Sequence, residues 1–164
     1  MRLLVLLVFA MLCMAGCSTV ISNQSLALVD RRITFAELRK NPDVYAGKHL
    51  LLGGGIAGVR NTSAGGELEV VQFATDESGE ITSMAASGGR FLVSSPGFLD
   101  PALYRIGLLV TVVGKVQGSK TMWLAGVEYT YPVLTIQELH LWQPEEMSPP
   151  PSFHFGLGVG TVIH

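Results

Sequence analysis

Residues 49–59 have the sequence HLLLGGGIAGV, with apolar side chains at Leu50, Leu52, Ile56 and Val59. Apolar residues that recur at every second position are typical of a β-strand with one buried face. Glycines inside such a strand mark a bulge or a sharp bend, so we interpret residues 53–55 as a bend. The alternative, a phosphate-binding loop, requires a helix directly after the glycines, whereas here apolar strand residues follow them.

Further stretches up to residue 142 show the same alternation and are separated by clusters of Gly, Pro, Asn and Ser. The predicted strands are 49–59, 68–73, 90–94 and 108–116, with one or two more from 122–127 and 129–142, and residues 61–66 are predicted to be rich in turns. Strands without helices between them favour a small barrel over an α/β sheet. The predicted fold class is mainly β: an antiparallel, OB-like barrel of five or six strands with one short N-terminal helix.

The short helix is predicted to begin at Thr34. Thr34 and Glu37 are spaced as in a capping box, in which each side chain binds the other residue's free backbone N–H. Pro42 disfavours helical geometry at the residue before it, so the helix cannot run far. Three side chains are expected to pack inward from this region: Phe35, Leu38 and Tyr45.

The N-terminus combines a positive charge with a short apolar run. Arg2 precedes an unbroken apolar stretch over residues 3–15. As a helix this stretch rises about 20 Å, which is less than the roughly 30 Å hydrocarbon core of a bilayer. We therefore interpret residues 1–16 as a signal peptide.

The sequence Met14-Ala15-Gly16-Cys17 resembles the lipobox of bacterial lipoproteins, although Met stands where Leu is commoner. The resemblance implies cleavage between Gly16 and Cys17 and lipid attachment at Cys17. An uncleaved anchor and a conventional signal peptide that leaves a free thiol are the alternatives. Ser18 follows the cysteine in place of Asp, which by resemblance to enterobacterial sorting implies an outer-membrane, periplasm-facing protein held to membrane lipid by its acyl chains.

Charge and cysteine usage exclude several classes of function. Lys and Arg number 11 against 13 Asp and Glu, without a basic stripe, so we expect no nucleic acid partner. Cys13 and Cys17 both lie near the N-terminus, which leaves no disulfide framework for the fold and no CxxC metal site.

Residues that could support catalysis are scattered along the chain. His49, His140, His154 and His164 form no metal-binding pair. Ser94 and Ser95 lack the Gly-x-Ser-x-Gly frame of an exposed nucleophile. We therefore predict no catalytic residue, no metal and no cofactor, and expect that the protein is not an enzyme.

Aromatic residues in the last strand offer a possible ligand face. Tyr129, Tyr131 and Trp142 could bind sugar or peptidoglycan if the barrel is OB-like, and core packing is the alternative because aromatic residues favour strands. Glu69 and Arg90 are expected to pair on a barrel face.

The chain divides into four expected segments: a signal peptide (1–16), a lipidated N-terminus and linker (17–32), the barrel domain (33–143) and a Pro/Gly-rich C-terminal tail (144–164). In the tail, apolar residues alternate with small ones over residues 153–163, a pattern of membrane-crossing β-strands. One strand cannot cross alone because its backbone groups would be unpaired in lipid. The tail is therefore a flexible or self-docked segment, a strand added to an envelope protein, or part of a homo-oligomeric membrane barrel.

Much of the chain resembles one family, the Slp-type outer-membrane lipoproteins of Gram-negative bacteria. The similar stretches are residues 41–47, 53–56, 61, 68–70, 89–91, 98–101, 104–107, 110–114, 129–133 and 140–142. The resemblance implies an outer-membrane lipoprotein linked to starvation or stationary-phase stress, without an established catalytic activity. The expected function is a non-enzymatic, anchored interaction module that supports envelope integrity or a stress response. Oligosaccharide or peptidoglycan binding, and oligomeric membrane assembly through the tail, are the alternatives.

Overall fold

The computed structural model describes residues 20–143, which contain two short α-helices, one 3₁₀ helix and six β-strands. The helices are α2 (Asn23–Leu26), α3 (Phe35–Lys40) and the 3₁₀ helix η1 (Pro42–Tyr45). The strands are β1 (His49–Thr62), β2 (Gly65–Thr75), β3 (Ile81–Ser83), β4 (Gly89–Ser95), β5 (Leu109–Leu124) and β6 (Val127–Leu141).

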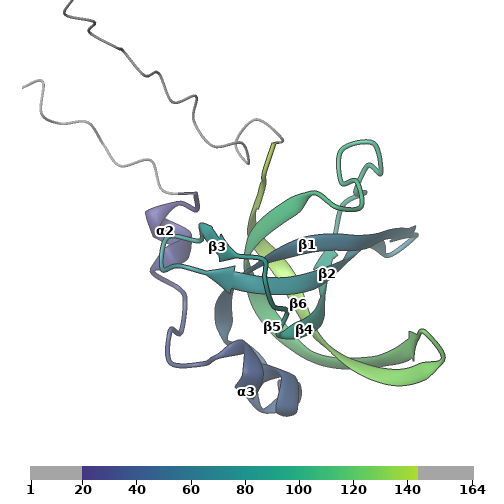
Figure 1. Ribbon diagram of the computed structural model, residues 1–164, viewed down its shortest axis with the longest axis horizontal. Helices are drawn as coiled ribbons and strands as arrows, with labels where there is room; N and C mark the ends of the chain where they lie inside the picture. Colours follow the sequence, from purple (N-terminus) through teal and green to yellow (C-terminus); the bar gives the residue numbers. More distant parts are fainter. Residues whose placement is uncertain (1–19, 144–164) are drawn as a thin grey trace, which may run out of the picture.

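Five of these strands are joined in a closed ring of backbone pairing (Figure 1). β1 pairs with β2 and β5, β5 pairs with β6, and β2 pairs with β4. The ring closes where β4 meets β6, with Leu92 opposite Val133. β3 extends the sheet beyond β2, outside the ring. The mainly β, OB-like architecture of five or six strands is therefore confirmed.

One pairing differs from the antiparallel barrel predicted from the sequence, because β4 and β6 run parallel. The other four pairings of the ring are antiparallel. A closed ring with an odd number of strands cannot reverse direction at every joint, so one joint must be parallel. The alternation of apolar residues identifies strands but does not reveal how many of them close the ring.

The core lies inside the ring. On β1 the predicted inward residues Leu50, Leu52 and Ile56 are at most 6% exposed. They pack with buried residues from every other ring strand and from α3: Leu38, Leu68, Val70, Phe91, Val93, Leu99, Leu108, Val110, Val112, Val116 and Leu134. Each fully buried side chain of this kind contributes about 1.5–3 kcal/mol.

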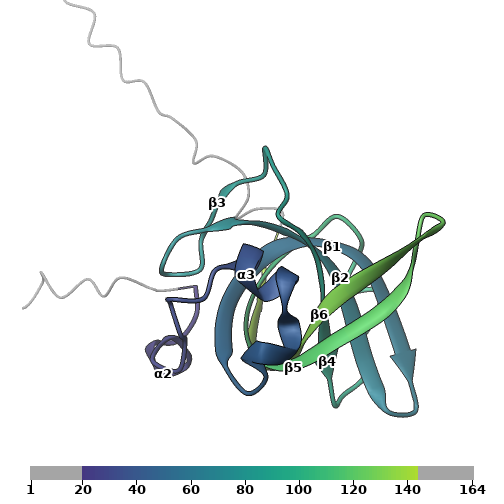
Figure 2. The same ribbon diagram turned by 90° about the horizontal axis from the view of Figure 1, so that it is seen from below.

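Helix α3 lies across one end of the ring (Figure 2). The capping box is formed, since the Glu37 backbone N–H donates to Thr34 Oγ1 at 3.3 Å and the Thr34 N–H donates to Glu37 Oε2 at 2.8 Å. Leu38 is fully buried, and the Phe35 ring packs edge-on against Phe91 at 5.9 Å. The predicted helix start and the inward packing of its apolar side are confirmed.

The glycines of β1 allow a close approach between strands, as the bend interpretation predicts. A Cβ atom at Gly54 would lie 2.0 Å from the carbonyl oxygen of Val71 on β2, which no side chain tolerates. The register of β1 against β2 also shifts between Ile56 and Gly58. Beyond this bulge both strands continue into residues 61–66, so the predicted turn-rich segment contains only a two-residue turn.

The predicted boundaries of the last strands are wrong. Segments 108–116 and 122–127 were expected as separate strands, but β5 runs from Leu109 to Leu124 without a break. Gly118, with a φ of +131°, absorbs an irregularity that does not end the strand. The chain turns at Ala125 and Gly126, which have φ values of 50° and 87°, as in the two-residue hairpin turns that favour positive φ.

The interpretation of residues 17–32 as a linker is wrong from residue 20 onward. Ile21 is fully buried, and α2 follows with Ser22 as its N-cap. Ser22 also bonds to Glu138 on β6, and Val29 forms a parallel bridge with His49. Ile21 follows Val20, and four polar residues separate it from the apolar run 26–29, so no regular period marks which of these side chains pack inward.

The predicted signal peptide, the cleavage and lipidation residues Gly16 and Cys17, and the tail (144–164) lie outside the described residues. Within residues 20–143, no helix has the length and apolar character needed to span a membrane.

Candidate functional site

The three aromatic residues predicted as a ligand face do not lie together. Tyr129 and Tyr131 lie near the start of β6, with ring centroids 4.6 Å apart. Trp142 follows the opposite end of β6, where its indole Nε1–H donates to Thr111 Oγ1 at 3.0 Å. Tyr131 is only 1% exposed and is thus packed against protein. The structure therefore contains no exposed face made of all three aromatic residues.

Tyr131 instead belongs to a polar cluster that links β2, β4 and β6. Its hydroxyl donates to Glu69 Oε1 at 3.0 Å, and Arg90 Nη1 donates to the same oxygen at 2.7 Å, which confirms the expected Glu69–Arg90 pair. The Tyr129 hydroxyl accepts the Arg90 backbone N–H at 2.9 Å. Burial, together with the bond to Glu69, raises the pKa of Tyr131 to about 12. This phenol therefore remains neutral near neutral pH.

A polar groove of about 380 Å³ lies beside this cluster. Its polar lining residues are Arg60, Thr62, Glu67, Ser94, Ser95 and Lys120. Glu67 lies between two cations, since it accepts hydrogen bonds from Arg60 and, at 2.9 Å, from Lys120 Nζ. The charged side chains of the groove are therefore already paired with one another.

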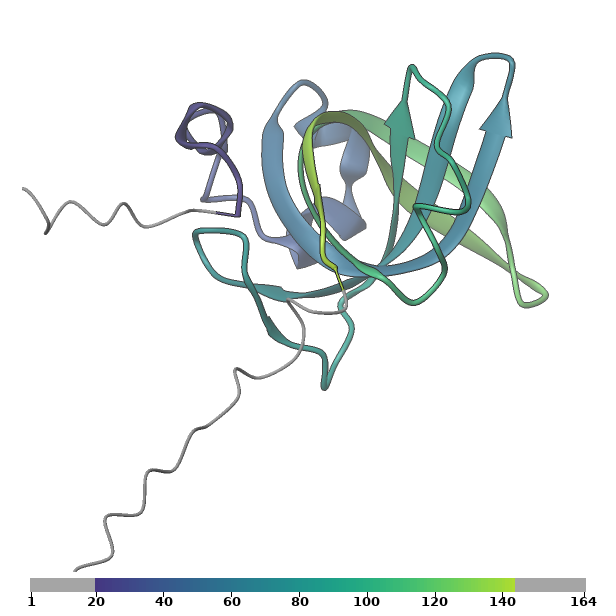
Figure 3. The same cartoon turned by 90° about the horizontal axis from the view of Figure 1, so that it is seen from above.

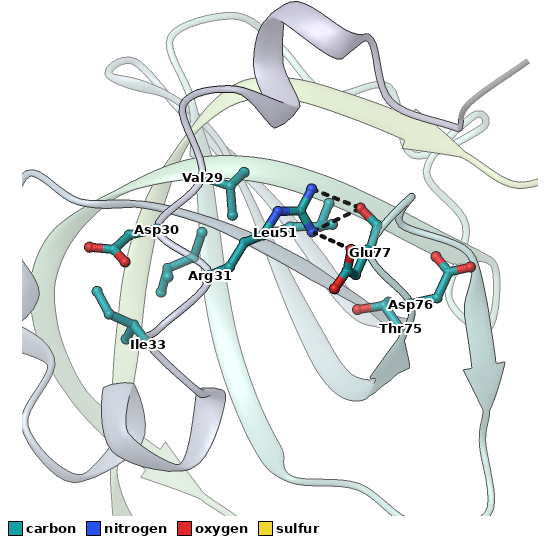
Figure 4. Close-up of a pocket in the computed structure, with 9 residues that line it drawn as sticks. Val29, Asp30, Arg31, Ile33, Leu51, Thr75, Asp76 and Glu77 are labelled. Atoms are coloured by element: carbon teal, nitrogen blue, oxygen red, sulfur yellow. Dashed lines mark hydrogen bonds and ion pairs between the residues drawn. The ribbon is translucent and has the colours of Figure 1, made fainter.

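A second cavity, of about 340 Å³, lies between the N-terminal segment and the ends of β1 and β2 (Figure 4). Arg31 reaches across it, and both of its terminal nitrogens donate to the carbonyl oxygen of Glu77, at 3.1 and 3.2 Å. On the same segment a hydrogen bond from Arg32 lowers the pKa of the Asp30 carboxyl. Lys48 lies 3.7 Å from the same carboxylate. Ion pairs thus hold this cavity's walls together.

The described residues offer no metal centre or activated nucleophile at these cavities. Within the segment from 20 to 143, no three side chains of His, Cys, Asp or Glu are grouped so that they could hold a metal ion. Ser94 Oγ lies 3.0 Å from Thr135 Oγ1 and 3.2 Å from the Leu134 carbonyl oxygen, so its hydrogen-bond partners are a hydroxyl and a backbone carbonyl.

Large apolar side chains are exposed at one end of the molecule, which we call the loop end. It is defined by Phe98, Leu103 and Ile106 of the β4–β5 connection and by Trp123 and Val127 beside the β5–β6 turn, all at least 60% exposed. Figure 3 shows this connection, the β1–β2 turn and the β5–β6 turn projecting on the side opposite α2. Large exposed apolar side chains are frequent at sites that bind another molecule.

The backbone that carries these side chains is held in place. Asn61 on β1 binds both backbone groups of Leu99, with its amide nitrogen 2.8 Å from the carbonyl oxygen and its Oδ1 2.9 Å from the N–H. Leu99 itself is 4% exposed and part of the core. Strand alternation does not predict this surface, although Phe98 and Ile106 in a connection rich in Gly and Pro were an available signal.

The chain is similar to two curated proteins of Escherichia coli strain K12. It is 27% identical over 135 residues to the outer membrane protein Slp, an alignment that covers 82% of this chain and 71% of that protein. It is 32% identical over 113 residues to the uncharacterized lipoprotein YeaY, which covers 67% of this chain and 58% of that protein.

Among solved structures, the mitochondrial single-stranded DNA binding protein Rim1 from S. cerevisiae aligns with a TM-score of 0.34 and 17% identity. That alignment covers 57% of this chain and 93% of Rim1. A likeness of this degree says nothing about what this chain binds.

A family model gives the widest match. The model of the outer membrane lipoprotein Slp family matches residues 14–156, which include every strand and helix described above. With most of the chain matched, this protein belongs to the outer membrane lipoprotein Slp family.

Proposed function

We propose that this protein is a lipoprotein of the outer membrane, acylated on Cys17 and facing the periplasm, that acts by binding and not by catalysis. The observation that carries the proposal is where the family match begins. It starts at Met14, the first residue of Met14-Ala15-Gly16-Cys17. The region shared with the family thus includes Gly16 and Cys17, the residues at which we propose cleavage and acylation.

The proposed destination is the outer membrane because Ser18, and not Asp, follows the cysteine. Three acyl chains on one residue give stable anchoring, since two lipid signals already suffice where one chain binds marginally. The names of the two relatives, an outer membrane protein and a lipoprotein, agree with this location.

The proposed action is to hold another envelope component at the loop end, and so to support envelope integrity or a stress response. Phe98, Ile106 and Trp123 are each more than 70% exposed. Hydrogen bonds with Asn61 fix the backbone of Leu99, next to Phe98. Aromatic side chains such as Phe98 and Trp123 are frequent anchors of protein interfaces. Each charged group that lines the two cavities already has a hydrogen-bond or ion-pair partner within the protein, which favours a surface partner over a small charged ligand.

Metabolic labelling with radioactive palmitate, followed by separation of inner and outer membranes, tests the anchoring. The wild-type protein is expected to take up label and to sediment with the outer membrane. Cys17→Ser is expected to take up none, and Ser18→Asp is expected to take up label but to remain with the inner membrane. Equal labelling of wild type and Cys17→Ser contradicts the proposal.

A further inference from the structure

The packed part of the chain begins almost directly after the proposed lipid attachment site. Ile21 is 0% exposed. The backbone N–H and the hydroxyl of Ser22 donate to the two carboxylate oxygens of Glu138, at 2.9 and 2.6 Å. Ser22 also caps α2 by accepting the Ser25 N–H at 3.3 Å. These contacts fix the chain to the barrel from Ile21 onward.

The distance from the barrel to the membrane is therefore short. Residues 18–20 separate Cys17 from Ile21, and even a fully extended chain spans at most about 14 Å over this interval. The headgroup layer of a bilayer is itself about 5–7 Å thick on each side. If Cys17 carries the acyl chains, as proposed above, the surface around α2 must lie against the headgroups or within about 7–9 Å of them.

The composition of that surface suits contact with lipid. Residues 20–29 contain no charged side chain, so no ion has to lose its hydration when this segment enters the interface. Asn23 and Gln24 are exposed amides, and Leu28 is 47% exposed. The first charged residues beyond this segment include Asp30 and Arg32, which pair with each other at 3.0 Å.

From these observations we infer that the α2 face, defined as residues 22–29, rests on the headgroup layer of the bilayer that holds the acyl chains. The occupant of this face is the lipid surface itself. The contact fixes the orientation of the barrel, because α2 and the loop end lie on opposite sides of the molecule (Figures 1 and 3). The loop end, with Phe98, Ile106 and Trp123, consequently points away from the membrane.

Headgroup quenching tests this orientation in the full-length lipidated protein. A fluorophore is attached to a cysteine introduced by Gln24→Cys on α2, or by Ser63→Cys in the β1–β2 turn as the matched exposed control. The proteins are placed in vesicles of phosphatidylethanolamine and phosphatidylglycerol that contain a nitroxide-headgroup lipid. Position 24 is expected to lose at least half of its fluorescence, whereas position 63 is expected to lose little. Equal quenching at both positions, or none at position 24, overturns the inference.

A tether insertion separates this inference from the proposed anchoring. About twelve Gly and Ser residues placed between Thr19 and Val20 form a flexible coil, which should weaken quenching at position 24 without reducing palmitate uptake. A protein that takes up no palmitate refutes the anchoring. A protein that takes up palmitate but shows no quenching at position 24 leaves the anchoring intact and refutes the lipid contact. Energy transfer between labelled copies at position 24, without quenching, would assign the α2 face to a second copy of the chain and would also refute it.

Discussion

The hydroxyl of Ser22 lies 2.6 Å from one carboxylate oxygen of Glu138, and the Ser22 backbone N–H donates to the other at 2.9 Å, across 116 positions of sequence. This contact ties the segment that precedes the barrel to the last strand of the barrel. Hydrogen bonds to a charged acceptor are stronger than those between neutral groups. The contact thus makes α2 part of the folded domain and leaves no flexible spacer after Ile21.

Removal of this carboxylate should release α2 before it affects the barrel. For Glu138→Ala we expect faster amide hydrogen exchange in residues 22–27 and a free energy of unfolding lower by about 1 kcal/mol. Glu128→Ala, at an exposed position on the same strand, serves as the control and should change neither quantity. Unchanged exchange in residues 22–27 of Glu138→Ala would show that α2 is held by other contacts.

Helix α3 should stabilise the fold through the buried side chain of Leu38. Leu38 is fully buried at the end of the barrel, so Leu38→Ala is expected to lower the free energy of unfolding by about 2–5 kcal/mol. Leu103→Ala removes the same atoms from a 60% exposed position and should change it by less than about 0.5 kcal/mol. Urea denaturation measures both variants, and similar losses would mean that α3 does not close the core.

The glycine run of β1 should be intolerant of even one added methyl group where it faces β2. Gly54→Ala would place a Cβ atom 2.0 Å from the Val71 carbonyl oxygen, and relief requires the two strands to separate. We expect a loss of about 1–3 kcal/mol or more in the free energy of unfolding. At Gly97 an added Cβ would meet only Ser95 Oγ, at 3.7 Å, so Gly97→Ala should be nearly neutral. A thermally stable Gly54→Ala would contradict the strand spacing.

Alkaline pH should destabilise the fold through Tyr131. Its pKa is raised from 10.0 to about 12 by burial and by the bond to Glu69, so the folded protein holds this proton more tightly than the unfolded chain does. The contribution of the protonated Tyr131 hydroxyl to the free energy of unfolding is complete below about pH 10 and is lost progressively as the pH rises toward about 12. Denaturation of wild type and Tyr131→Phe between pH 9 and about 12 measures it. The stability difference between the two proteins should change across this window, and a constant difference would contradict the assignment.

The loop end should bind a partner without supporting the fold. A photo-crosslinking side chain at Phe98 is expected to form adducts with an envelope component in cells, whereas one at exposed Lys40 on α3 should not. The double variant Phe98→Ser, Ile106→Ser should unfold within about 0.5 kcal/mol of wild type. Crosslinking of equal strength from both positions, or from neither, would remove the loop end as the binding surface.

Features that depend on local pattern were predictable from the sequence. The alternation in residues 49–59 predicted β1 and its inward residues, and the spacing of Thr34 and Glu37 predicted the start of α3. The Glu69–Arg90 pair also followed from opposite charges on neighbouring strands. Each of these inferences uses side chains close in sequence or placed by a regular period.

Features that depend on the whole fold were not predictable in the same way. The parallel β4–β6 joint follows from closure of a five-stranded ring, and the burial of Ile21 depends on a contact between Ser22 and Glu138. Tyr131 was predicted on a ligand face because OB-like barrels bind ligands through aromatic faces, with core packing as the alternative. Its burial depends on Glu69 and Arg90, which reach it from two other strands.

If Cys17 is acylated as proposed, the protein is confined to a surface, and the ring of paired strands then has a further consequence. Tethered copies diffuse in two dimensions and meet one another far more often than they would free in solution at the same abundance. An open sheet would then present its unpaired edge to every neighbour, and edges of this kind join readily into aggregates. Because each of the five ring strands pairs on both sides over part of its length, the ring itself offers adjacent barrels no continuous open edge along which they could join into one sheet.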